Sequence, residues 1–230
     1  MRAGFSSIAL AAALAAAPAA RAQVQVQPAA PGELPAWLRA RLDSRLDART
    51  RVLVERVIDS SYAAGVPAEP LVDKALEGAS KRAPSDAIVR AIRGLAVDLT
   101  TARQSLGAQS LGEELTAGAA ALRAGVDTDA LRRLRHERPG QPLVIPLSVL
   151  TDLIASGVPA ENATRSVLAL TSKGAADEQL VAFRRDVERD IGIGASPGIA
   201  ATLNVRGFNA SLNVGEGGTG RSGTPRKPPP

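Results

Sequence analysis

One short phrase recurs along this chain and constrains its fold more than any other feature. It stands as AGVPAE at 64–69, as AGVDTD at 124–129 and as SGVPAE at 156–161. Each copy separates two stretches whose apolar residues recur at helical spacing. A glycine in the left-handed region closes a helix, and the following valine can pack back against the last turn. Proline or aspartate then opens the next helix, so each phrase predicts a helix–turn–helix corner. The corner glycines are Gly65, Gly125 and Gly157.

The apolar periodicity between these corners predicts an all-α array of about eight short helices. They are expected near residues 36–64, 67–81, 85–106, 110–124, 127–137, 146–156, 159–173 and 177–191. The stretches that follow the first and third corners are similar to each other. Duplicated three-helix units would explain this, and so would chance recurrence of Gly-Val-Pro in an alanine-rich chain. The corner spacings of 60 and 32 residues are too uneven for a regular solenoid.

The first 22 residues have the three parts of a secretory signal peptide. Arg2 supplies the positive charge, residues 8–17 form an apolar run, and small residues precede the expected cleavage near Ala22. The run is too short to cross a bilayer, which takes about 20 residues. We therefore expect export to the periplasm or out of the cell. Because the chain has no cysteine and no later segment of membrane-spanning length, the mature protein is expected to be soluble and unanchored.

The rest of the chain divides by composition into a linker, a helical domain and a tail. Residues 23–35 are rich in proline and are predicted to be a flexible linker, and residues 36–191 form the helical domain. Residues 192–230 are rich in glycine and proline, and we expect most of them to be disordered. Within them, residues 201–205 and 211–214 flank a turn and are compatible with a small β-hairpin.

Charge and aromatic content argue against nucleic acid as a partner. The formal charge is +5, but the signal peptide and the tail carry most of it, so the helical body is nearly neutral. Nucleic-acid binding requires a concentrated basic surface. Stacking platforms for single strands or sugars require several aromatic rings, and the mature chain has only four. They are Trp37, Tyr62, Phe183 and Phe208.

No motif for metal, cofactor or nucleophilic chemistry is present. His136 is the only histidine, and without cysteine the usual zinc, copper and haem ligand sets cannot form. The chain lacks Gly-x-Ser-x-Gly, and no serine precedes a lysine by three residues. The dense glycine cluster at 215–220 lies in the tail and has no helix after it. We therefore predict no catalytic residues, no metal and no cofactor.

Neighbouring carboxylates are the remaining candidates for catalysis. They occur as Glu113 with Glu114, as Asp177 with Glu178, and as Asp186, Glu188 and Asp190. A pair of carboxylates can serve as acid and base in cell-wall hydrolysis. However, each group also lies beside basic residues or in a helical first turn, where compensation of the helix dipole explains it.

One cluster of arginines could serve a binding role. It contains Arg132, Arg133, Arg135 and Arg138, interleaved with two leucines. Such a patch can bind anionic lipid or an acidic partner. The alternative interpretation is the exposed face of a short amphipathic helix.

These observations favour a non-enzymatic periplasmic or envelope protein that binds a partner, or acts as a scaffold, through its helical surface. The partner would be an envelope protein or an anionic lipid surface. Two other hypotheses stay open. One is a carboxylate-dependent enzyme that acts on the cell wall, and the other is a peripheral binder of anionic lipid through the helix from Arg132 to Arg138.

Overall fold

The computed structural model describes residues 34–216, which form helices and loops with no strand among them. This confirms the predicted all-α class. The expected signal peptide, nearly all of the expected linker, and residues 217–230 lie outside the described residues. The helices are α1 (Ala36–Asp43), α2 (Ala48–Ala63), α3 (Glu69–Ser80), α4 (Ser85–Leu106), α5 (Gly112–Arg123), α6 (Thr128–Glu137), α7 (Val144–Ala155), α8 (Ala160–Thr171), α9 (Asp177–Gly192) and α10 (Pro197–Glu216).

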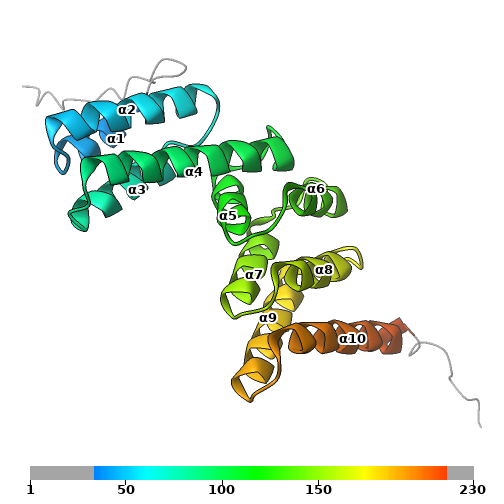
Figure 1. Cartoon of the computed structure of the whole chain (residues 1–230). Coiled ribbons are helices and arrows are strands. Elements are labelled where there is room, and N and C mark those ends of the chain that lie inside the picture. Colours follow the sequence, from blue (N-terminus) through cyan, green and yellow to red (C-terminus); the bar gives the residue numbers. More distant parts are fainter. Residues whose placement is uncertain (1–33, 217–230) are drawn as a thin grey trace, which may run out of the picture.

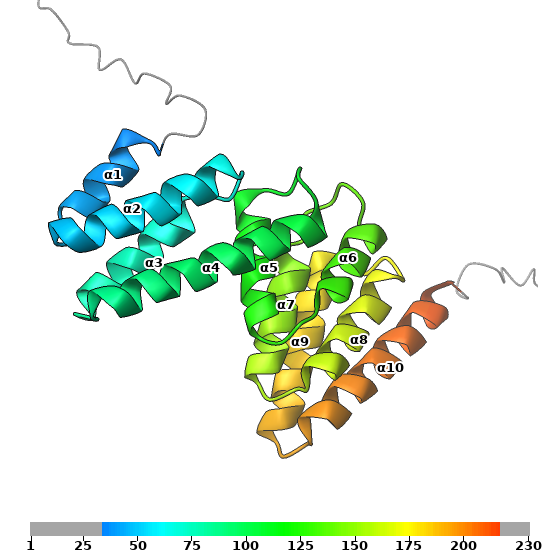
Figure 2. The same cartoon turned by 45° about the horizontal axis from the view of Figure 1, so that its top comes forward.

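The helices pack in two layers (Figures 1 and 2). The even-numbered helices α2, α4, α6, α8 and α10 contact one another in sequence and form one layer. In the second layer, α5 packs on α7 and α7 on α9, while α1 packs on α3 at the N-terminal end. The 22-residue helix α4 contacts α2 and α3 as well as α5 and α6, so it joins the first helices to the rest of the array.

The three predicted corners all close helices as expected. Gly65, Gly125 and Gly157 have φ of +79°, +101° and +91°. In each corner the glycine N–H and the next N–H both bond carbonyls of the preceding helix, as in Val158 N to Leu153 O at 3.0 Å. The valine that follows each glycine is buried. The corner therefore satisfies the last carbonyls and adds an apolar contact.

The same hydrogen-bond pattern closes three further helices. At the ends of α8 and α9 the residues with positive φ are again glycines, Gly174 and Gly194. At the end of α3 the residue is Arg82, with φ of 53°. Arg82 is the one non-glycine residue with positive φ among residues 34–216.

The first predicted helix, residues 36–64, is broken in the structure, which corrects that expectation. Residues 44–47 separate α1 from α2. The break follows from Asp47, whose carboxylate accepts hydrogen bonds from the N–H groups of Arg49 (3.1 Å) and Thr50 (3.0 Å). An aspartate that caps a new N-terminus in this way favours a fresh helix over a continuous one. The apolar spacing survives the break, because Leu42 and Leu46 are both buried.

The hairpin considered for residues 201–205 and 211–214 is wrong, because both segments lie in α10. The apolar residues of this segment also include a set spaced by three and four positions, as in a helix. Ala201 is buried, and Val205 and Phe208, four and seven residues on, pack against the core. Asn204 on the adjoining face donates to Asp190 of α9 at 2.8 Å. Helical structure therefore extends beyond residue 191, the expected end of the domain.

Small residues allow α4 and α5 to approach each other closely. A methyl group added to Gly118 would lie 3.0 Å from Leu106 Cδ1 and 3.1 Å from Ala102 Cβ. The wider core consists of leucine, valine, isoleucine and alanine with one buried aromatic ring, Phe183. This agrees with the scarcity of aromatics in the sequence.

Two glycine-to-alanine substitutions should change stability in opposite directions. Gly157→Ala should lower the free energy of unfolding by about 1 kcal/mol, because alanine is strained at φ +91°. Gly94→Ala should raise it by about 0.5–1 kcal/mol, because Gly94 lies inside α4 and an added methyl meets no atom within 4 Å. Urea unfolding followed by circular dichroism measures both, and an equal effect at the two sites would contradict this interpretation.

Candidate functional site

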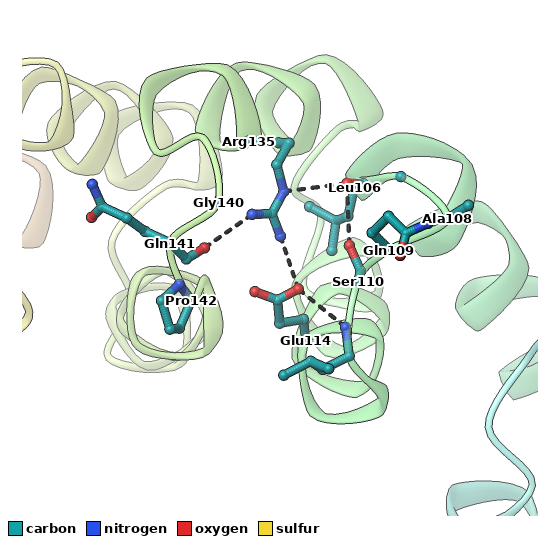
Figure 3. A pocket seen from close by; sticks show the side chains of 11 residues that line it. Leu106, Ala108, Gln109, Ser110, Glu114, Arg135, Gly140, Gln141 and Pro142 are labelled. Atoms are coloured by element: carbon teal, nitrogen blue, oxygen red, sulfur yellow. Dashed lines mark hydrogen bonds and ion pairs between the residues drawn. The ribbon is translucent and has the colours of Figure 1, made fainter.

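A groove opens between two loops in the middle of the array (Figure 3). Residues 106–111 end α4 and lead to α5, and residues 140–142 lead to α7. Arg135 of α6 and Glu114 of α5 lie between these two walls. The groove has a volume of about 410 Å³.

The Arg135 guanidinium holds both loops in place. Its Nε donates to the Leu106 carbonyl at 3.2 Å, and Nη1 donates to the Gln141 carbonyl at 2.9 Å. Its Nη2 donates to the Glu114 carboxylate at 2.8 Å. The planar guanidinium can satisfy three acceptors in different directions, which a lysine ammonium does less specifically. One side chain therefore joins the end of α4, the loop before α7 and the first turn of α5.

Glu114 completes this junction from the opposite side. Its side chain is only 6% exposed, and it accepts from the Leu143 N–H at 2.9 Å and from the Leu111 N–H at 3.3 Å. Both donors lie at helix N-termini, where backbone N–H groups have no intrahelical partner. The carboxylate therefore caps α5 and α7 together while it pairs with Arg135.

The surroundings of Glu114 favour its ionised form. Burial raises the pKa of the carboxyl, but the hydrogen bonds from Leu143, Arg135 and Leu111, with the charge of Arg135, outweigh that effect. The net result is a pKa below the ordinary value for glutamate. A carboxylate that stays ionised and accepts three hydrogen bonds does not supply protons at neutral pH.

At the mouth of the groove the exposed groups are neutral. Leu111 is 68% exposed although it lies at the N-cap of α5, where a polar side chain is preferred. The Ser110 hydroxyl donates to the Leu106 carbonyl at 3.1 Å, and Arg103 fixes the Ala108 carbonyl at 3.0 Å. The loop is thus held by its own hydrogen bonds, and it offers a ligand an apolar side chain on a fixed backbone.

The four arginines of the predicted patch face different surroundings. Arg135 belongs to the junction, and Arg138 is buried and pairs with Asp177 at 2.6 Å. Arg132 is exposed and pairs with Asp129 on its own helix. Arg133 is exposed and lines a separate hollow between α6 and α8. Three of the four therefore lie on α6 and Arg138 directly follows it, but only Arg132 and Arg133 are exposed.

The carboxylates considered for catalysis each have a local partner, except two. Asp177 pairs with Arg138, and Glu188 lies 3.5 Å from Arg184. Asp186 pairs with Arg189, and Asp190 accepts from Asn204. Glu113 and Glu178, together with His136, are exposed. Within the described part of the chain, no three histidine or acidic side chains are grouped so as to hold a metal ion.

The role of Glu114 was not evident from the sequence, which placed it in an acidic pair in a first turn. The only local signal is its position three residues after Leu111, as in a capping box. In the usual box the first residue is serine or threonine, whose hydroxyl accepts a hydrogen bond from the backbone N–H three residues on. A leucine side chain cannot accept that bond. Arg135 is 21 residues away, so nothing local indicates that it and Glu114 meet.

Comparisons with family models, curated proteins and solved structures return no match to this chain. Between residues 34 and 216, no helix combines the length and the apolar character needed to cross a membrane. The site must therefore be interpreted from its own geometry.

Removing the charge of Glu114 should destabilise the fold and change its response to acid. Glu114→Gln should lower the free energy of unfolding by about 2–3 kcal/mol, because Arg135 loses its ion pair and a buried acceptor is lost. Since the folded pKa is lowered, the contribution of Glu114 is complete above the ordinary pKa of about 4.5 and is lost as pH falls through the folded value. The difference between wild type and variant should therefore shrink below that pH.

Glu113→Gln is the matched control, since Glu113 is exposed and lies one residue away. It should change stability by less than about 0.5 kcal/mol at neutral pH. Urea titrations at several pH values measure both variants. Equal losses in the two variants, or a Glu114→Gln deficit that grows as pH falls, would show that the junction does not hold these loops.

Proposed function

We propose that this chain is a non-enzymatic exported protein that binds a partner in the bacterial envelope through its helical surface. The export step rests on the signal peptide indicated by the sequence. The binding surface is the groove between residues 106–111 and 140–142. The partner contributes an apolar segment, because the open groups of this groove are neutral and the charged ones are occupied.

The observation that carries this proposal is the exposure of Leu111. Leucine is among the poorest N-cap residues, and this one is neither buried nor hydrogen-bonded through its side chain. It therefore lowers helix stability without adding to the core. The loop beneath it is held by Arg135, Glu114 and Arg103, so its position is fixed before any partner arrives. An ordered apolar residue on a rigid support is what a binding surface requires.

The two other hypotheses have less support. Carboxylate-dependent catalysis needs a free pair of carboxyl groups that face one substrate. Glu114, Asp177 and Asp186 are each paired with an arginine, and the exposed Glu113 and Glu178 lie on different helices. Binding of anionic lipid through α6 would depend on Arg132 and Arg133 alone, since the two other arginines point into the fold's own ion pairs.

Leu111→Ser separates binding from folding. Serine at the N-cap should raise the free energy of unfolding by about 0.5–1 kcal/mol, while it removes the apolar contact. Immobilised wild-type protein should retain a defined envelope component from an extract, and the variant should retain at least about tenfold less, which corresponds to about 1.4 kcal/mol.

Val97→Ser is the control, because Val97 is 65% exposed on α4 and is not part of the groove. Its retention should equal that of the wild type. If Val97→Ser and Leu111→Ser retain the component equally, the groove is not the binding surface. If the wild type retains no component above the background of the bare support, the binding role itself is wrong.

A further inference from the structure

A second pocket lies in the N-terminal part of the array, apart from the groove at Leu111. It is formed between the loop that joins α1 to α2 and the C-terminal end of α3. Its volume is about 530 Å³. The lining residues are Ser44, Arg45, Leu76, Ala79, Ser80 and Arg82.

The backbone of Arg82 has an unfavourable conformation for its residue type. Arg82 closes α3 with φ of 53°, and its N–H bonds the Ala79 carbonyl at 2.9 Å. Five other helices end with the same hydrogen-bond pattern, and all five have glycine at the equivalent position. A side chain at this position crowds the backbone, whereas glycine does not. The arginine is therefore retained at a cost to the stability of this corner.

The pocket carries two positive charges that the described residues leave uncompensated. Arg45 and Arg82 are both exposed, and no hydrogen bond or ion pair joins either side chain to residues 34–216. The carboxylates on the neighbouring segments are occupied by other groups. Asp43 pairs with Arg51, Asp47 with Thr50, Asp73 with Arg41, and Glu77 with Lys74 and Lys81.

The donors available in this pocket are guanidinium groups. The hydroxyl of Ser44 donates to the Arg41 carbonyl at 3.1 Å, and that of Ser80 donates to the Glu77 carbonyl at 2.8 Å. Their protons are therefore already used. Two guanidinium groups offer paired N–H donors whose spacing matches the oxygens of phosphate. A phosphate monoester at neutral pH carries a charge of about −1.5 to −2. Two arginines match this charge better than they match the single negative charge of a carboxylate ligand.

We propose that this pocket binds a phosphate group, with Arg45 and Arg82 as its two ligands. Leu76 and Ala79 supply an apolar wall against which the organic part of a phosphate ester lies. The phosphate comes either from a free small molecule or from a lipid headgroup, because both present the same oxygens. The site is independent of the proposed binding role of the groove.

The test compares stability and phosphate binding in the same variants. Inorganic phosphate is titrated into the full mature chain by calorimetry at low ionic strength. In parallel, the chain is floated with phosphatidylcholine vesicles that contain or lack phosphatidic acid. Arg82→Gly should raise the thermal midpoint, because glycine relieves the strained φ, and should weaken phosphate binding about tenfold. Arg45→Gln should weaken binding to a similar extent and leave the thermal midpoint unchanged.

Arg93→Gln is the control, since Arg93 is exposed on α4 away from the pocket. It should bind like the wild type. The site is supported if the wild type binds either probe saturably and both pocket variants lose this binding. The probe that binds then shows whether the phosphate is free or in a lipid headgroup. The proposal is wrong if the wild type binds neither probe. It is also wrong if Arg82→Gly and Arg45→Gln bind within twofold of the wild type, or if Arg93→Gln loses as much affinity as they do.

Discussion

The two-layer array depends on a single backbone device, a residue in the left-handed region that ends one helix and redirects the chain into the next. Six helices close this way, and four of these corners, at Arg82, Gly125, Gly157 and Gly194, carry the chain from the second layer to the first. The device works because it satisfies the last carbonyls of the helix within two residues. Without it, the reversals would need longer loops, and neighbouring hairpins would pack less closely.

Much of this could be predicted because it is local. The glycine-valine phrases identified three corners, and the apolar spacing placed most helices within a few residues of their observed ends. The misses arose where two local signals competed. An aspartate such as Asp47 can lie on a charged helix surface or cap a new helix, and the structure shows the cap. The alternation in 201–205 fitted a strand, but packing of α10 on α8 and α9 selected the helix.

The groove could not be predicted, because its geometry depends on contacts between distant residues. Glu114 reaches Leu143, 29 positions further on, and Arg135 reaches Leu106, also 29 positions away. Sequence patterns of one helix do not indicate which carboxylate meets which arginine. The sequence patterns did indicate an arginine-rich helix. A surface that binds an anionic partner, however, requires that its arginines are not already paired with acidic residues of the same chain. Two of the four arginines are instead used inside the fold, which a count of charges does not reveal.

Leu111 and Arg82 are linked by the same physical argument although they lie in different parts of the array. Each occupies a helix terminus where another residue type would be more stable: a polar side chain at the N-cap, and glycine at the left-handed corner. Neither contributes to the core, since both are exposed. Where local preference and packing both argue against a residue, we propose that it is kept for contact with something outside the chain. At such a position the residue that favours binding lowers stability. A single substitution should therefore raise the free energy of unfolding and weaken binding. A residue with a purely structural role cannot show that combination.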